Sequence, residues 1–291
     1  VPLDQLGRLL LKHIFNYVGH FEEGLARVQL VQKWGYIDER GSLAIPVQYD
    51  AAGDFQQGLA PAKRQGQFGF INTTGEFVIP PFFHQAHTFQ HGLAAVQRVQ
   101  YWGFIDQQGE WVIEPQFEQV FPFQGEVAPA VEDDRWGLID RSGDWLCAPQ
   151  YDLPEGLPPG EFFDDMALVR QGHHFGFINK QGECSIPPQF TAAGDFNEGL
   201  APIQREGKFG YIDKSGATVI PFQYEDAGVF ADGLAPVQED GQWGYLTSEG
   251  HFAIVPLYDM AMPFRNGLAL VEYQGGWAYI DRFGDMVWRE H

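Results

Sequence analysis

The sequence is poor in basic residues and cysteine, and it lacks any long apolar run. Its 291 residues include 18 Lys and Arg against 39 Asp and Glu, a formal net charge of −21, and only 2 Cys. Nucleic-acid binding depends on Lys and Arg that neutralise phosphates, so this balance argues against nucleic acid and against anionic membrane surfaces. A basic partner or a cation suits the charge better. The simpler interpretation is an acidic surface that keeps the protein soluble.

No segment approaches the roughly 20 apolar residues of a membrane-spanning helix, so membrane insertion is not expected. The opening "VPLDQLGRLLLKHIF" is too short and too charged to span, and no small-residue cleavage site follows an apolar region there. The chain begins with Val1 rather than Met, which suggests that a segment upstream was removed. We interpret Cys147 and Cys184 as free thiols, which leaves the compartment undecided.

Aromatic residues (15%) and Gly (35) are abundant, and they recur together. The interval between aromatic–Gly pairs is 34 residues six times and 39 once, and a five-residue insertion in "DLPEGLPPGEFF" accounts for the exception. In the last copy Ala278 replaces the glycine. The aromatic residues of the pairs are Trp34, Phe68, Trp102, Trp136, Phe175, Phe209, Trp243 and Trp277.

Each unit predicts three strands. A "GLA" element opens the first strand, and the aromatic–Gly pair lies in the second, with alternating side chains on opposite faces. Asp38 and Gly41 bracket the next turn, a spacing typical of a type I turn. Pro46 then ends the third strand, because proline has no N–H to donate to a ladder.

Two further features of the unit concern packing. Tyr49, Ala52 and Phe55 lie three apart, which predicts one helical turn after the third strand. The glycine of the pair leaves its own face bare, so a second backbone can approach closely. One such unit cannot cover its apolar face, whereas stacked units bury it continuously.

The pattern resembles the bacterial WG (or KWG) repeat family through "KWGYID", "YWGFID", "RWGLID" and "QWGYL". The resemblance covers residues 21–288 and departs from the motif where Phe replaces Trp and at Ala278. It implies a β-rich tandem-repeat module, in the bacterial cytoplasm or exported to the periplasm or beyond. The family motif has no recognised catalytic role, so the resemblance implies neither an enzyme nor a cofactor.

The predicted fold is therefore all-β: 34-residue, three-stranded meander units stacked as an open, solenoid-like array. A closed, propeller-like ring is the alternative. Leu3, Leu6, Leu10 and Ile14 recur at helical spacing and predict a helix that covers an exposed end. We expect residues 1–20 to hold this capping helix and a truncated repeat. Residues 21–291 would form one continuous domain of eight repeats, with the insertion near 152–164.

One candidate binding site is an aromatic strip. Phe77, Trp111 and Trp145 occupy equivalent positions of three successive units, nine residues after the aromatic of each pair. In a stacked array they would line up and could stack on sugar rings or hold a partner's apolar side chains. The alternative is that these rings pack inside the array, as most aromatic residues do.

A second candidate is a metal site. His84, His87 and His91 have spacings of three and four, which would place them on one side of a helical turn, where they could share Zn²⁺. Equivalent repeats carry ordinary polar residues there, such as Asp50 and Gln57, so solvated histidines are the preferred interpretation and no metal is expected.

A third candidate is the acidic insertion, which could hold Ca²⁺ or a basic partner. No D-x-D-x-D-G loop is present, and a solvated loop is the preferred interpretation. The recurrent Asp38 and its copies follow the turn, so they do not indicate acid–base chemistry. The acidic residues of the insertion are Asp152, Glu155, Glu161, Asp164 and Asp165.

These observations favour a non-catalytic binding module that presents an extended repeat surface to a protein or glycan partner. The first alternative is a hydrolase acting on cell-wall or polysaccharide material, with its residues near the insertion. The second is a structural spacer for a removed upstream domain.

Overall fold

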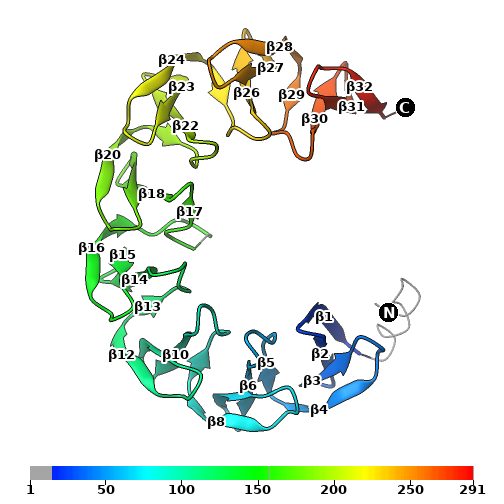
Figure 1. The fold of residues 1–291 in the computed structure, drawn as a ribbon, viewed down its shortest axis with the longest axis vertical. Helices are drawn as coiled ribbons and strands as arrows, with labels where there is room; N and C mark the ends of the chain where they lie inside the picture. The colour runs from blue at the N-terminus through cyan, green and yellow to red at the C-terminus, as the bar shows by residue number, and fades with distance from the viewer. Residues whose placement is uncertain (1–14, 157, 291) are drawn as a thin grey trace. The chain divides into compact units, whose positions relative to one another are not determined.

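The computed structural model describes residues 15–156 and 158–290, and within those ranges it contains strands and turns but no helix (Figure 1). The predicted all-β class is confirmed. The chain divides into two compact units, Val1–Trp145 and Leu146–His291. Its strands form four-stranded antiparallel sheets, and each sheet takes four consecutive strands of the chain.

The first unit contains three complete sheets and most of a fourth. Its strands are β1 (Tyr17–Glu22), β2 (Leu25–Leu30), β3 (Lys33–Asp38), β4 (Leu43–Tyr49), β5 (Ala51–Ala52), β6 (Ala60–Arg64), β7 (Gln67–Ile71), β8 (Phe77–Phe83), β9 (Gln85–Ala86), β10 (Ala94–Arg98), β11 (Tyr101–Ile105), β12 (Trp111–Phe117), β13 (Gln119–Val120), β14 (Ala128–Glu132) and β15 (Arg135–Ile139).

The second unit begins within the strand that completes that fourth sheet. Its strands are β16 (Trp145–Asp152), β17 (Phe162–Phe163), β18 (Met166–Gln171), β19 (His174–Asn179), β20 (Cys184–Phe190), β21 (Ala192–Ala193), β22 (Leu200–Arg205), β23 (Lys208–Asp213), β24 (Thr218–Tyr224), β25 (Asp226–Ala227), β26 (Leu234–Glu239), β27 (Gln242–Thr247), β28 (Phe252–Tyr258), β29 (Met260–Ala261), β30 (Leu268–Tyr273), β31 (Gly276–Asp281) and β32 (Met286–Arg289).

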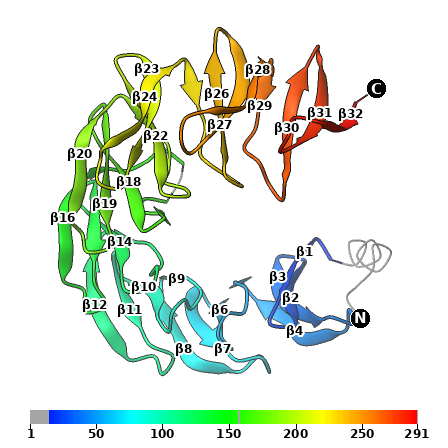
Figure 2. The ribbon, with the colours of Figure 1, turned by 45° about the horizontal axis from the view of Figure 1, so that its top comes forward.

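The predicted three-stranded unit is wrong, because a short strand precedes the three long ones in most sheets. In the second sheet this strand is β5, which pairs with β6. The N–H of Asp50 donates to the carbonyl of Lys63 (2.9 Å), and the N–H of Gly53 donates to that of Pro61 (2.8 Å). Figure 2 shows the equivalent β9 beside β10.

The helical turn predicted for Tyr49, Ala52 and Phe55 is wrong for the same reason. Ala52 lies in β5, and the backbone around it bonds to the following strand instead of coiling on itself. The spacing of three did identify residues that share a core, because all three side chains are buried. Three-residue spacing alone therefore does not distinguish a helical turn from a bent extended segment.

The close approach predicted at the glycine of the pair is confirmed. A Cβ at Gly35 would lie 2.6 Å from the carbonyl oxygen of Ile45 and 2.8 Å from the nitrogen of Val47. β4 passes over Gly35 at an irregularity in its register with β3. The strand runs on through Pro46, so the predicted strand end there is wrong; proline is tolerated at such an irregularity.

Ala278, the one departure from the glycine, lies in a different environment. It stands opposite Arg289 in β32, and the register irregularity of that pair falls later, beyond Tyr279. The strand pairing at Ala278 therefore differs from that at Gly35, and the Cβ of Ala278 is buried.

Consecutive sheets share hydrophobic cores. One core combines Tyr36 and Tyr49 of the first sheet with Ala60, Ala62 and Ile71 of the second. All five side chains are fully buried. The stacking predicted from the repeat is confirmed for these neighbouring sheets, and the periodic residues are the ones that form their contacts.

Polar contacts also join successive repeats. Glu23, at the "EGLA" turn, accepts from the N–H of Gln57 (2.7 Å) and of Gly58 (2.8 Å) in the next such turn. In the second unit Asp164 accepts from Gly199 (2.6 Å). The pairs Gln57–Gly92, Glu198–Gly233 and Asp232–Gly267 repeat this contact. Part of the acidic surplus thus serves as acceptors for backbone N–H groups.

Two further predictions concern the N-terminal capping helix and the insertion. The predicted capping helix falls on residues 1–14, outside the described residues, and the predicted truncated repeat overlaps β1, which pairs with β2. The insertion separates β16, which ends at Asp152, from β17, which begins at Phe162. Over residues 15–156 and 158–290, no helix is long and apolar enough to cross a membrane.

Candidate functional site

The recurrent aspartates are engaged in their turns, as the sequence predicts. Asp38 Oδ1 accepts from the N–H of Arg40 (2.9 Å) and of Ser42 (2.8 Å). At Asp213 the Ser215 hydroxyl donates at 2.6 Å and, with the backbone N–H groups, lowers the pKa of the carboxyl. These charged acceptors hold the turns closed.

The three rings of the aromatic strip are half-buried. Each meets an aromatic ring of the preceding fourth strand edge-on, with centroid distances of 5.8, 5.8 and 5.4 Å. The rings therefore contribute to contacts between sheets while keeping part of their surface in solvent. The pairs are Phe77 with Tyr49, Trp111 with Phe83, and Trp145 with Phe117.

The three histidines lie around the short strand β9 and have separate roles. His84 Nδ1 accepts from the N–H of Val99 (3.0 Å). The ring of His87 lies 4.8 Å from that of Trp102, and partial desolvation lowers its pKa. His91 occupies a turn with φ of 50°. Within residues 15–156 and 158–290, no group of three His, Cys, Asp or Glu side chains is placed to hold a metal ion.

Three of the five acidic residues near the insertion have partners. Asp152 accepts from the N–H of Gly172 (2.6 Å), and Asp165 pairs with Lys180 (2.8 Å), which lowers the pKa of Asp165. Asp164 takes part in the turn-to-turn contacts described above. These three carboxylates therefore stabilise the fold around the insertion.

The remaining two, Glu155 and Glu161, are exposed. Glu161 has an electrostatic effect on the half-buried Asp195, which lies outside the insertion. Burial, and then the negative charge of Glu161, raise the pKa of Asp195. The sequence did not indicate Asp195, because it occupies the same repeat position as Asp54.

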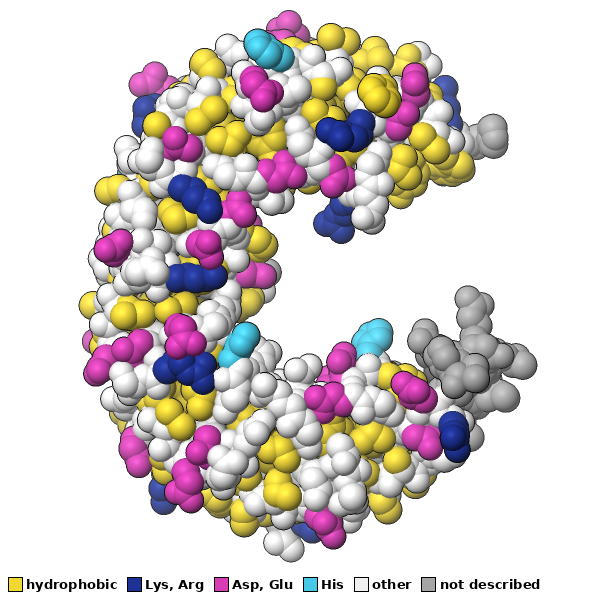
Figure 3. Space-filling model, in the orientation of Figure 1, with side chains coloured by type: hydrophobic (Ala, Val, Ile, Leu, Met, Phe, Trp, Pro, Cys, Tyr) yellow, Lys and Arg dark blue, Asp and Glu magenta, His cyan; other side chains and the backbone are white. Residues whose placement is uncertain are grey.

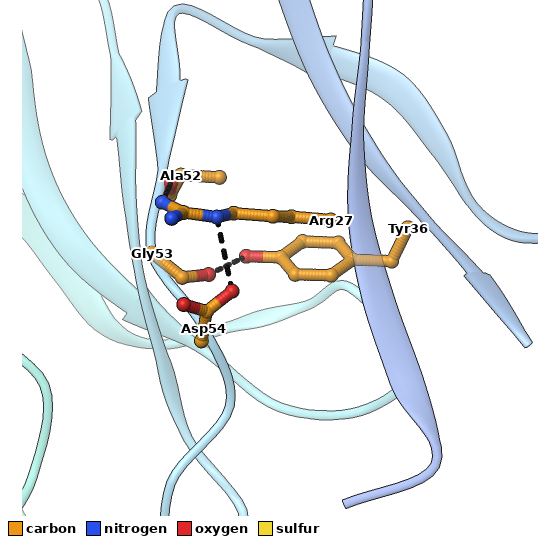
Figure 4. Close-up of polar contacts among 5 residues, drawn as sticks. All are labelled: Arg27, Tyr36, Ala52, Gly53 and Asp54. Atoms are coloured by element: carbon orange, nitrogen blue, oxygen red, sulfur yellow. Dashed lines mark hydrogen bonds and ion pairs between the residues drawn. The ribbon is translucent and has the colours of Figure 1, made fainter. Parts of the chain in front are cut away.

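Asp54 itself belongs to a polar cluster that the sequence also did not indicate (Figure 4). Arg27 Nε lies 3.0 Å from Asp54 Oδ1, and its Nη1 donates to the carbonyl of Ala52 (3.2 Å). The Tyr36 hydroxyl donates to the carbonyl of Gly53 (2.7 Å), and burial is the largest cause of the raised pKa of Tyr36. The cluster ties the first sheet to the chain that enters the second.

Aromatic rings flank the Arg27 guanidinium. Its Cζ lies 5.6 Å from the centroid of Tyr17 and 5.7 Å from that of Trp34. Arg27 stands where Pro61, Pro202 and other apolar residues stand in later repeats, so its departure from the pattern was the available signal. With an ion pair and two cation–π contacts, its charge is satisfied internally.

The last sheet carries a groove with a volume of about 560 Å³, which we call the methionine groove because Met262 lines it. Three of the chain's four Met side chains, Met260, Met262 and Met286, lie in or next to the strands of this sheet and are exposed by 42 to 44%. Methionine adapts its shape to different apolar partners, so this clustering is the signal that sequence analysis overlooked. The lining residues are Met262, Pro263, Arg265, Asn266, Leu268, Leu270 and Tyr279.

Part of the groove is lined by residues whose equivalents in the preceding sheet are buried. Leu268 and Tyr279 are 37% and 42% exposed, whereas Leu234 and Tyr245 at the same positions of the preceding sheet are 3% and 0% exposed. Trp288 in β32 is 51% exposed. The last sheet therefore exposes apolar side chains whose equivalents in the preceding sheet lie in the core.

Charge is dispersed over the visible face. In Figure 3 acidic side chains lie scattered among hydrophobic and basic ones on each unit, without a broad basic patch. Such a surface provides a diffuse negative potential, which favours approach of basic partners.

A family model described as "WG containing repeat" matches residues 3–33, 34–67, 68–98, 102–136, 136–172, 175–209, 209–243 and 243–277. The matched spans differ in length, so the uniform 34-residue unit is not supported. None of the curated proteins compared with the chain matches it.

Among solved structures, a eukaryotic initiation factor is 11% identical over 92% of this chain and 85% of its own, with a TM-score of 0.48. BamB from Moraxella catarrhalis is 12% identical over 98% of this chain and 94% of its own, with a TM-score of 0.40.

Proposed function

Because the chain belongs to the family of WG-containing repeat proteins, we propose that it is a non-catalytic binding module whose methionine groove holds an apolar segment of a protein partner. A β-rich repeat fold of this type serves generally as a binding or scaffold module. The observation that carries the proposal is the exposure, in the last sheet, of Leu and Tyr positions that are buried in the preceding sheet.

The lining favours a protein over a glycan. Met262, Leu268, Leu270 and Tyr279 offer apolar surface, with Arg265 as the single charged side chain. Glycan sites use flat aromatic faces with several polar groups, whereas a groove of Met and Leu matches the side chains of a peptide. The acidic surface around it favours a partner segment with basic flanks.

The test is a comparison of two charge substitutions in the second unit. Met262→Glu places a carboxylate in the groove, and Val219→Glu places one on the outer strand β24; both wild-type side chains are 43% exposed. Partners captured from a lysate of the native host would be identified first, and their affinities for purified variants measured by calorimetry.

We expect Met262→Glu to weaken binding at least ~10-fold, because an unpaired charge in an apolar interface costs more than about 1.4 kcal/mol. Val219→Glu should leave the affinity unchanged. Equal affinities for both variants would contradict the proposal. A glycan as the sole captured ligand would instead favour the aromatic strip of Phe77, Trp111 and Trp145 as the binding surface.

A hydrolase remains the second candidate because of Asp195. Its raised pKa and the nearby Glu161 resemble the acid of a carboxylate pair. Incubation of the wild type and of Asp195→Asn with cell-wall polysaccharides would test for hydrolase activity. Release of sugars by the wild type alone would establish the enzyme in place of the binding module.

A further inference from the structure

The two cysteines occupy repeat positions that face each other across successive sheets. Cys147 in β16 takes the position of Ile45 in β4. Cys184 in β20 takes the position of Phe77 in β8. Elsewhere this second position packs against the aromatic residue four places after the first, as Phe77 does against Tyr49.

The backbones approach more closely here than at the corresponding turns whose glycine contacts are described, those of Gly75, Gly109, Gly143, Gly216, Gly250 and Gly284. A Cβ at Gly182, two residues before Cys184, would lie 2.7 Å from the carbonyl carbon and oxygen of Leu146, the neighbour of Cys147. At Gly75 the corresponding Cβ would meet only side chains, at 2.7 Å the Cγ2 of Ile45. Because the two cysteine side chains are small, the turn at Gly182 can lie closer to the backbone of β16.

Both thiols lie close enough to the Tyr151 hydroxyl to influence it. Burial is the largest cause of the raised pKa of Tyr151, and interactions with Cys147 and Cys184 raise it further. Cys147 is 6% exposed and Cys184 is exposed, and both are free thiols in this structure. Gln150 Nε2 also lies 3.4 Å from Cys147 Sγ. The pair therefore combines an accessible thiol with a sheltered one at close range.

We propose that Cys147 and Cys184 form an intramolecular disulfide under oxidation. Peroxide reacts with the accessible Cys184 thiolate to give a sulfenic acid and water. The Cys147 thiolate then attacks that sulfur, the S–S bond forms, and the hydroxyl leaves as a second water after taking up a proton. Two thiols lose two electrons and two protons in total, and one peroxide is reduced to two waters.

The disulfide would close a loop around the insertion. Residues 153–161 lie between the two cysteines, so the bond would link the two strands that flank the insertion. A cross-link of this length stabilises a fold mainly by restricting the unfolded chain. The disulfide would therefore stabilise the second unit under oxidising conditions and not under reducing ones.

The test uses the full chain, treated with one equivalent of hydrogen peroxide and compared with a sample kept in dithiothreitol. Mass spectrometry follows alkylation with iodoacetamide, and digestion identifies the joined peptides. Cys147→Ser and Cys184→Ser are the matched controls, because each removes one sulfur without adding bulk. Thermal unfolding of the same samples gives a second readout.

We expect the treated protein to be lighter by two hydrogens, to resist alkylation at both positions and to give one peptide pair containing Cys147 and Cys184. Its thermal midpoint should exceed that of the reduced protein, and dithiothreitol should reverse the shift. Neither serine variant should show the shift. The proposal is overturned if both thiols remain alkylatable, if Cys184 proceeds to a sulfinic acid, or if cross-links join only separate molecules.

Discussion

Two junctions between successive repeats differ in the contacts that their glycine turns make with the preceding repeat. At the Tyr49 junction, Phe77 meets the tyrosine ring edge-on and the Gly75 turn rests on the side chain of Ile45. At the Tyr151 junction, cysteines replace both Ile and Phe, and the Gly182 turn rests on the backbone of Leu146. At the Tyr151 junction the smaller cysteine side chains thus accompany a closer approach of the two backbones.

The largest effect should come from adding a methyl group at the two turns. Both Gly182 and Gly75 have positive φ, so alanine is strained at either position. Gly182→Ala also meets a backbone that cannot move, and we expect a loss of about 3 kcal/mol in unfolding free energy, against about 2 kcal/mol for Gly75→Ala. Urea unfolding measures both; a larger loss for Gly75→Ala would contradict the closer backbone approach.

Removing the side chains that make the contact should destabilise the two junctions by different amounts. Phe77→Ala removes a half-buried ring and its edge contact with Tyr49, an expected loss of about 2 kcal/mol. Cys184→Ala removes one exposed sulfur, and the expected loss is under about 0.5 kcal/mol. Reduced samples unfolded in urea provide the comparison. Equal losses would mean that the ring contributes no more than the thiol.

Alkaline pH should weaken both junctions. Burial raises the pKa of Tyr49 and of Tyr151, so the unfolded chain releases its tyrosine protons first. This contribution to stability is fully present below the ordinary tyrosine pKa of about 10 and falls as the pH rises above it. Thermal midpoints from pH 8 to 11.5 should therefore decline, and Tyr151→Phe should flatten the decline. An unchanged slope in that variant would exclude Tyr151 as a contributor.

The smallest effect concerns the turn-to-turn contacts near each junction. Glu23 accepts from two backbone N–H groups and Asp164 from one. We expect Glu23→Gln to cost about 1 kcal/mol and Asp164→Asn about 0.5 kcal/mol, because a neutral acceptor bonds less strongly than a charged one in these exposed sites. Thermal unfolding at low and high salt checks the difference, which salt should reduce.

Local features could be predicted because they repeat and because backbone geometry requires them. The turn from Asp38 to Gly41 forms as expected, with φ of 82° at Gly41 and the N–H of Gly41 donating to the Asp38 carbonyl at 2.8 Å. Gly35 admits the backbone of β4, as its missing side chain indicates. Both follow from a short stretch of chain alone.

Features that depend on the neighbouring repeat could not be predicted. The short strand β5 pairs with β6 through backbone groups, which leave no mark on side-chain periodicity. The methionine groove depends on residues that depart from the repeat, and the electrostatic effect of Glu161 on Asp195 depends on a residue of the insertion. The repeat pattern identifies core residues, but it does not distinguish candidate functional residues, since equivalent positions carry similar residues whatever their surroundings.

The sequence by itself determined the repeat, the aromatic–Gly strands, the turns and the burial of the periodic residues, because each depends on backbone conformation or on the alternation of side chains along one strand. Only the tertiary structure decided the four-stranded sheets, the exposure of Met262 and Tyr279, and the close approach of Gly182 to the backbone of Leu146. Those depend on how closely one repeat settles on the next, and the volumes of side chains from two separate parts of the chain fix that distance.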